Sequence, residues 1–459
     1  MADSPADLAA RLAAHGRVDS APEAMLAVRD RWPGHPPAAR ELPRAAVRPS
    51  SIPDLQAVVR LARASSVPLV PIGGGSNVVG AVDVPGGAIV VDLRDLRAID
   101  PVDPRSLVVR AEAGVLGGDL ADALERDNYL LPHDPQSLEL STVGGWVATR
   151  ASGIFSTGYG GIESLVAGLE VVLPDGELLV TGRGPRSAAG PNLSELFAGS
   201  EGAFGIVAAA RLRVRRRPEA RLLRAHAVPS FGSGLELVRG LVQDGVPIAA
   251  VRLYDPVETA ELGRRLGGDV DGCLLVTAVD GPAALAAAAE AHVGTAVAGA
   301  AGRDLGRGPA EAWYAGRHAC EWLDVGNDRP GRIADAIEVA ADWATVGELA
   351  ADLASAVRAH ADEAWYHVSH VYPQGASIYV IAFIRREDPA EALSAYRAVW
   401  EAVMDRTLAA GGTITHHHGV GRARLPWLAA ELGTGLDVLR AIKRALDPER
   451  LISPGRLSL

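Results

Sequence analysis

Apolar and polar positions follow two different rhythms along the first part of the chain. From Leu55 to Leu61 apolar side chains recur at the spacing of one helix face. Ser51 and Pro53 precede them as a helix start signal, so we expect a helix that ends near Ala64. Shorter apolar runs predict strands over residues 68–72, 88–92 and 107–111, and a second helix over 117–126. This alternation indicates a domain built from both helices and strands.

The pattern changes in the middle of the chain. The turn Pro174-Asp175-Gly176 separates two apolar runs, 169–173 and 177–180, which predicts a β-hairpin. After Arg217-Pro218 the composition shifts toward alanine-rich helical segments. Strands are expected there near residues 248–254, 273–280, 333–340 and 377–385.

These patterns predict an α+β protein in four parts. A helical lead-in that ends at Pro36-Pro37 occupies residues 1–47, and two α+β domains follow over 48–217 and 218–405. Residues 406–459 contain a helix end at Gly411-Gly412, a helix start near Leu425 and a basic amphipathic stretch over 439–446. We expect this last segment to return to the first domain.

Composition then narrows the functional class. With 459 residues, of which 48% are apolar and 22% charged, the chain is typical of a soluble globular protein with two or more domains. Its net charge of −11 argues against a nucleic-acid partner. We see neither a signal peptide nor an apolar run long enough to span a membrane, and expect a cytoplasmic protein. Cys273 and Cys320 suggest neither a disulfide framework nor a metal motif, and Cys273 is expected in the core.

Three glycine-rich loops carry the first candidate chemistry. In Pro71-Ile72-Gly73-Gly74-Gly75-Ser76-Asn77, backbone amides freed of β-carbons can converge on an anion, although a flexible turn is the alternative. The loop fits neither the P-loop nor the Rossmann pattern. Similar loops occur at Ser141-Thr142-Val143-Gly144-Gly145 and at Gly199-Ser200-Glu201-Gly202, at junctions of predicted strands.

The second candidate is the run His416-His417-His418 in a chain of twelve histidines. Imidazole titrates near neutral pH, so such a run favours proton transfer or substrate anchoring. A divalent-metal site and purely structural hydrogen bonding remain alternatives.

The three glycine loops together resemble the flavin-binding domain of the vanillyl-alcohol-oxidase superfamily. Within it, Ala151-Ser152-Gly153, the segment from Ile248 to Asp255, and His416-His417-His418-Gly419-Val420-Gly421 resemble the alkylglycerone-phosphate synthases. The similarity runs from about residue 48 to the C-terminus. It implies a PCMH-type FAD-binding domain of two subdomains, followed by an α+β substrate domain with an antiparallel sheet.

What the resemblance implies for function is an unusual use of FAD. Such synthases exchange the acyl group of an acyl-dihydroxyacetone phosphate for an alkoxy group through a flavin N5 adduct, without net redox. Tyr372 would be the catalytic acid, one of the three histidines the base, and Arg252 a phosphate ligand, since its planar fork suits phosphate. Arg317 and Arg329 are candidates for a second phosphate-binding arginine. Tyr372 as a packed aromatic and Arg252 in a strand salt bridge are the structural alternatives.

The same resemblance supplies the expected FAD contacts. FAD is expected to be noncovalent, and no metal is expected. The chain would act as a homodimer on a lipid-like phosphoester, which is compatible with contact to a membrane surface. The expected flavin-binding residues are Pro71, Gly73, Gly74, Gly75, Ser76, Asn77, Asp134, Ser137, Ser141, Thr142, Gly144, Gly145, Thr149, Ala151, Ser152, Gly153, Glu201, Gly202 and Ile206.

Two other functions remain open from the sequence. An FAD-dependent oxidoreductase of a 2-hydroxy acid or another alcohol would use the same loops, with Tyr372 and the histidines orienting the substrate for hydride transfer. A flavin-binding protein without catalysis is the third reading.

Overall fold

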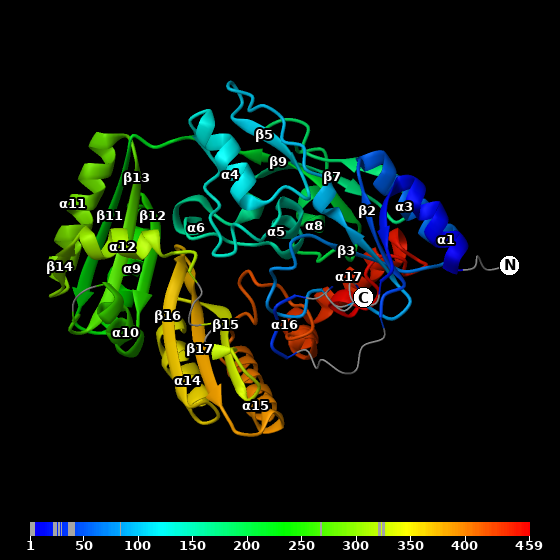
Figure 1. Ribbon diagram of the computed structural model, residues 1–459. Helices are drawn as coiled ribbons and strands as arrows, with labels where there is room; N and C mark the ends of the chain where they lie inside the picture. The colour runs from blue at the N-terminus through cyan, green and yellow to red at the C-terminus, as the bar shows by residue number, and fades with distance from the viewer. Residues whose placement is uncertain are drawn as a thin grey trace.

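The computed structural model describes residues 5–21, 25, 28, 30–34, 42–82, 84–266, 269–319, 323 and 326–459. They form two halves that lie side by side, with the second half at the left and bottom of Figure 1. The predicted α+β class is confirmed. Cys320 and the expected helix end at Pro36-Pro37 lie outside the described residues.

Two four-stranded sheets build the first half. One sheet has the order β1-β2-β4-β3, in which β2, β4 and β3 are parallel and β1 is an antiparallel edge. The other, β5-β9-β7-β8, is antiparallel. A short ribbon pairs β6 with β10. The strands are β1 Gly16–Asp19, β2 Ala45–Pro49, β3 Leu69–Ile72, β4 Ile89–Asp92, β5 Val108–Glu112, β6 Tyr129–Leu130, β7 Val166–Val172, β8 Leu178–Val180, β9 Ile206–Arg213 and β10 Arg215–Arg216.

The helices of this half begin where the sequence signals lie. Helix α3 spans Ile52–Ala64, and the Ser51 hydroxyl caps it by accepting the Asp54 N–H at 3.2 Å. Its apolar face is buried, so the predicted helix is confirmed, as are α4 and the β7–β8 hairpin. The other helices are α1 Pro5–Leu12, α4 Gly117–Arg126, α5 Val143–Thr149, α6 Ser156–Tyr159, α7 Ile162–Leu165 and α8 Leu193–Phe197.

The second half is a seven-stranded antiparallel sheet of order β14-β11-β13-β12-β16-β17-β15. Helices α14 and α15 cover one end of it, and α11 lies at the other end (Figure 1). Its strands are β11 Ala220–Val228, β12 Ile248–Tyr254, β13 Cys273–Gly281, β14 Arg303–Gly306, β15 Arg332–Asp342, β16 Glu363–Val371 and β17 Gly375–Arg385. Its helices are α9 Phe231–Gln243, α10 Pro256–Leu266, α11 Ala283–Gly299, α12 Gly308–Ala315, α14 Val346–Arg358 and α15 Pro389–Ala409.

Four of these strands match the predicted ones, while β11, β14 and β16 were missed. Strand β16 is central in the sheet, yet its buried positions include His367, Ser369 and His370. A run with so many polar residues carries no clear apolar periodicity, so the sequence pattern does not show it. Cys273 is fully buried in β13, as expected.

The C-terminal segment crosses back to the first half, where the red helix α17 (Thr434–Leu446) lies beside the blue N-terminal elements (Figure 1). Lys443 anchors it: the buried ammonium donates to the carbonyls of Ala203 and Ile452, each at 2.7 Å, and pairs with Asp447. Before α17 the chain forms a 3-10 turn at Leu425–Trp427 and helix α16 at Leu428–Leu432. No described helix has the length and apolarity that a membrane span requires.

Candidate active site

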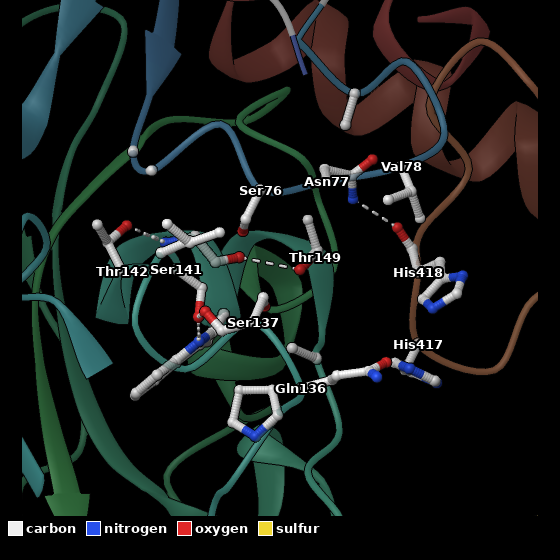
Figure 2. A pocket seen from close by; sticks show the side chains of 18 of the residues that line it. Ser76, Asn77, Val78, Gln136, Ser137, Ser141, Thr142, Thr149, His417 and His418 are labelled. Atoms are coloured by element: carbon white, nitrogen blue, oxygen red, sulfur yellow. Dashed lines mark hydrogen bonds between the residues drawn. The ribbon is translucent and has the colours of Figure 1, made fainter. Parts of the chain in front are cut away.

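A cavity of about 520 Å³ lies where the glycine loops of the first half face the sheet of the second half. Figure 2 shows Ser76, Ser137, Ser141, Thr142 and Thr149 on the loop side, with His417 and His418 opposite. Most of the expected flavin-binding residues line this cavity: Pro71, Gly73, Gly74, Gly75, Ser76, Asn77, Ser137, Ser141, Thr142, Gly144, Gly145, Thr149, Ala151, Ser152, Glu201, Gly202 and Ile206.

Asp134 and Gly153 do not line the cavity, so their expected contact with the cofactor stays a prediction. A β-carbon on Gly153 would lie 2.3 Å from the backbone nitrogen of Asp134, so the two segments are packed directly on each other. The Asp134 carboxylate is turned toward the second half, where it pairs with Arg317 at 2.7 Å and His318 at 2.5 Å. Both residues therefore shape the loop behind the cavity wall.

The glycine loops fit a flavin dinucleotide because they approach each other more closely than side chains allow. A β-carbon added to Gly73 would lie 2.2 Å from Thr142 Oγ1, and one added to Gly74 would lie 1.8 Å from the Leu140 carbonyl oxygen. Beside them, the backbone N–H groups of Gly75 and Ser76 donate to no acceptor within the described part of the chain. Free backbone donors of this kind suit phosphate oxygens.

A buried glutamate holds the histidine run in place. Glu338 of β15 is fully buried, and its carboxylate accepts the N–H groups of His416 at 2.6 Å and His418 at 2.9 Å. It also accepts the Thr415 hydroxyl at 2.8 Å. Burial is the largest single effect and raises the pKa of Glu338, but Arg424 and the three histidines together more than offset it, so this pKa lies well below its usual range.

Arg424 closes the same loop from the carbonyl side. Its buried guanidinium donates to the carbonyls of Ile414 at 2.7 Å and Gly419 at 2.9 Å, at the two ends of the histidine run. It also reaches the Glu338 carboxylate at 3.3 Å. Together the glutamate and the arginine satisfy the turn's backbone groups and fix its shape.

Two contacts join this loop to the flavin side of the cavity. The Asn77 amide donates to the His418 carbonyl at 2.8 Å, a bond drawn in Figure 2. The Glu201 carboxylate, which lines the cavity, accepts the N–H groups of Val420 at 2.6 Å and Gly421 at 3.1 Å. The predicted flavin loops and the predicted catalytic loop are thus one connected structure.

The histidines are hydrogen-bonded to tyrosines of β17 and of the turn before it. Nε2 of His416 lies 2.9 Å from the Tyr372 hydroxyl, and Nε2 of His417 lies 3.1 Å from the Tyr379 hydroxyl. Burial lowers the pKa of His416 and that of His417, and it lowers the pKa of His418 to about 4. All three imidazoles are therefore neutral near pH 7, and each can accept a proton.

Sequence reasoning missed several residues of this site, among them Ser156, Glu338, His370, Tyr379 and Arg424. His370 has a left-handed backbone, with φ of +47°, at a β-bulge of β16, and this conformation turns its ring toward His416 and His417. The buried polar residues of the 363–371 segment were the available signal. Ring nitrogens of His370, His416 and His417 lie within 4.8 Å of one another, a spacing that could also hold a metal ion.

The three predicted phosphate-binding arginines differ in position. Arg252 of β12 lines the cavity, 3.3 Å from Nε2 of His367 and with its guanidinium 5.9 Å from the Tyr379 ring centre. Arg317 is committed to Asp134. Arg329 is exposed and does not line the cavity. Of the three predicted arginines, Arg252 is the one that lines the cavity and can offer a cation to a molecule bound beside the histidines.

A cavity lined by glycine loops on one side, and by neutral imidazoles, tyrosines and an arginine on the other, defines a cofactor-dependent enzyme of the flavoprotein class. Residues 43–182 match the FAD binding domain, and residues 217–457 match the C-terminal domain of FAD linked oxidases. The chain belongs to this family of FAD-linked oxidases, and FAD is its cofactor, as expected.

Individual relatives include both kinds of enzyme considered from the sequence. The chain is 28% identical to alkyldihydroxyacetonephosphate synthase of Dictyostelium discoideum, over 91% of this chain and 74% of that one. It is 27% identical to the FAD-linked oxidoreductase YgcU of Escherichia coli strain K12, over 91% of this chain and 89% of that one. It is also 25% identical to the glycolate oxidase subunit GlcD of Bacillus subtilis, over 92% and 90%.

Solved structures show the same fold. An alkyldihydroxyacetonephosphate synthase superposes with a TM-score of 0.79 at 24% identity, covering 95% of this chain and 82% of that one. A p-cresol methylhydroxylase superposes with a TM-score of 0.84 at 18% identity, covering 98% and 96%. The expected PCMH-type fold is confirmed by these neighbours.

Proposed function

We propose that the protein is a nonredox FAD-dependent transferase that exchanges the acyl group of an acyl-dihydroxyacetone phosphate, or a related phosphoester, for an alkoxy group. The observation that carries this proposal is the pairing of each of two neutral imidazoles with a tyrosine hydroxyl, beside a cavity-lining arginine. His416 lies 2.9 Å from Tyr372, and His417 lies 3.1 Å from Tyr379. The exchange needs a base, an acid and a phosphate-binding cation, and these groups supply all three.

The chain's own residues perform the binding and the proton transfers. FAD, when bound between the glycine loops and the histidines, would supply an electron-accepting ring. The guanidinium of Arg252 pairs with the substrate phosphate. A neutral histidine takes the proton from C1, and a tyrosine gives a proton to the departing carboxylate, which keeps the electrons of the broken C–O bond. The alcohol then adds its oxygen to C1 and gives its own proton to the chain's residues, and a proton returns from them to C1, so that C1 of the ether again carries two hydrogens.

Noncovalent binding of FAD is part of the proposal. His133, the histidine beside the flavin loops, is buried and packed edge-on against Trp146, with ring centres 4.6 Å apart. It does not line the cavity. Denaturation should therefore release all of the flavin into the supernatant.

An anaerobic experiment tests the reaction type. The holoenzyme is mixed with palmitoyl-dihydroxyacetone phosphate and hexadecanol, with no external electron acceptor present. We expect the ether product and one fatty acid per turnover. The oxidoreductase reading, supported by YgcU and GlcD as relatives, predicts instead that D-lactate or glycolate bleaches the flavin rapidly, and that result would overturn the proposal.

Two tyrosine variants separate chemistry from packing. Tyr372→Phe removes the hydroxyl that lies 2.9 Å from His416 Nε2, and it should lower turnover roughly 10²-fold, the usual worth of general acid–base catalysis, with FAD content unchanged. Tyr366→Phe is the matched control, because Tyr366 lies on the neighbouring strand β16 and packs on Phe231, 4.8 Å between ring centres. Equal losses in the two variants would mean that Tyr372 acts only through packing.

A further inference from the structure

Six side chains beside the cavity form a closed ring of hydrogen bonds. They come from α6, from β16 and the turn after it, from β17 and from the histidine loop. The successive distances are Ser156 Oγ to His370 Nδ1 2.6 Å, His370 Nε2 to Tyr379 hydroxyl 3.1 Å, Tyr379 hydroxyl to His417 Nε2 3.1 Å, His417 Nδ1 to His416 Nδ1 3.0 Å, His416 Nε2 to Tyr372 hydroxyl 2.9 Å, and Tyr372 hydroxyl to Ser156 Oγ 3.4 Å.

The proton count of this ring is complete when every member is neutral. A neutral imidazole has one donor and one acceptor nitrogen, and a hydroxyl can donate once and accept once. Six members therefore hold six protons for six links. Every link is satisfied when each member donates its proton to the next member in one direction around the ring. Donation in the opposite direction satisfies the six links equally well.

The surroundings keep the imidazoles in that neutral state. Burial lowers the pKa of His370, that of His416 and that of His417. A second proton on any of them would make it a donor on both sides and would break one link of the ring. One buried imidazole alone is consequently a poor resting place for the proton that the reaction removes.

The ring has a side that faces the cavity and a side that does not. His370, Tyr379 and His417 line the cavity, whereas Ser156, Tyr372 and His416 lie behind them. Ser156 is buried and hydrogen-bonds to His370 on one side and to Tyr372 on the other, so it completes the circuit.

We propose that the ring acts as a single proton relay, in which Ser156 is the positioning residue that closes the circuit. Resting on the proposed function, the step takes the C1 proton onto one cavity-facing member, while another gives a proton to the departing carboxylate. Each link between them shifts one proton. The substrate keeps the electrons of its C–H bond, the carboxylate leaves with those of the C–O bond, and the ring holds six protons before and after. In the second half of the exchange the alcohol oxygen forms its bond to C1 and its proton enters the ring, while another ring proton returns to C1. C1 then carries two hydrogens again, and the ring still holds six protons.

Histidine NMR tests the ring without any turnover. The holoenzyme is labelled with ¹⁵N in its histidine rings, and Ser156→Ala is compared with the wild type. We expect the ring nitrogens of His370 to shift, and those of His416 and His417, which Ser156 does not touch, to shift with them. Ser156→Thr, which keeps the hydroxyl, should restore the wild-type spectrum.

Thr157→Val is the matched control in the same helix. The Thr157 hydroxyl accepts the Val371 N–H at 3.1 Å and belongs to no link of the ring. We expect Thr157→Val to leave the signals of His416 and His417 in place. A change in Ser156→Ala that is confined to His370 would overturn the relay. So would stoichiometric Zn²⁺ on the imidazoles of the isolated protein, since the metal would occupy the acceptor lone pairs.

Kinetics separate this proposal from the proposed function. Ser156→Ala should lower kcat about tenfold or more, with the KM and FAD content unchanged, and should turn a curved dependence of rate on solvent deuterium fraction into a linear one. An unchanged kcat and curvature would overturn the relay. If Ser156→Ala shifts the signals of all three histidines but the wild-type protein makes no ether, the hydrogen-bonded ring is supported and the transferase reaction is refuted instead.

Discussion

Glu338→Gln is the substitution that should reveal how the histidine run is held. Glu338 is fully buried, and its carboxylate accepts from the Thr415 hydroxyl and from backbone N–H groups of the histidine run, while it neutralises Arg424. Glutamine preserves the shape and one acceptor oxygen. Its NH₂ group, however, faces N–H donors, and Arg424 loses its charge partner.

The expected cost follows from these contacts. Removing one partner of a buried ion pair costs about 3–5 kcal/mol, and a buried N–H left without an acceptor costs about 1–3 kcal/mol. The three hydrogen bonds from Arg424 to carbonyl groups remain in the variant. The total cost should therefore lie near the lower end of the range obtained by adding these two costs. We therefore expect Glu338→Gln to lower the free energy of unfolding by about 4 kcal/mol, a large share of the roughly 5–15 kcal/mol that stabilises a typical domain.

Denaturant unfolding of the holoenzyme at pH 7, followed by tryptophan and flavin fluorescence, measures this loss. Asp335→Asn is the matched control, because Asp335 is also buried on β15 and accepts the Tyr396 hydroxyl at 2.6 Å. Burial raises its pKa to about 6, so its charge contributes no net stability at pH 7, and we expect a loss of about 1 kcal/mol from the weakened hydrogen bond alone. If the two variants lose the same amount, or if Glu338→Gln loses under 1 kcal/mol, the carboxylate does not hold the loop.

Two further perturbations test other parts of the site. Arg252→Lys keeps the charge but loses the planar fork, so the KM for a phosphate-bearing substrate should rise tenfold or more; an equal rise for a phosphate-free analogue would contradict the assigned role. His133→Phe tests acid stability. Burial lowers the pKa of His133 to about 3 from 6.5, so the wild type loses stability as pH falls below about 6.5, because the unfolded chain takes up the proton first. The variant lacks this titrating group, so its free energy of unfolding should rise by about 3 kcal/mol relative to that of the wild type between pH 7 and pH 4. Parallel pH profiles of the two free energies of unfolding would refute this prediction.

Local sequence signals predicted the elements whose side chains divide cleanly into apolar and polar faces. Helix α3 has its capping serine and one buried face, and the β7–β8 hairpin has its glycine turn. Strand β16 escaped prediction because its buried positions carry His367, Ser369 and His370. The two histidines are hydrogen-bonded to Glu258 and Ser156, which belong to other elements. No periodicity of apolar residues could reveal such a strand.

The candidate site shows the same division. Glycine loops and a histidine run are visible as composition, so FAD as cofactor and the histidines as candidates followed from the residues and the resemblance. Asp134 and Gly153 belong to the same loops, yet they pack behind the cavity wall. Which member of a motif faces the ligand depends on how the loop is packed, and the motif does not contain that information.

The sequence by itself determined the α+β class, the glycine loops and the presence of a histidine run, because short-range spacing and residue type are enough for each. Only the tertiary structure decided which groups act together. It brought Ser156 and His370, 214 positions apart, to a separation of 2.6 Å, and placed Glu338 under a loop that begins 77 positions later at Thr415. Hydrogen bonds require partners within about 3 Å, and for residues so distant in sequence that proximity is set by the packing of the two halves.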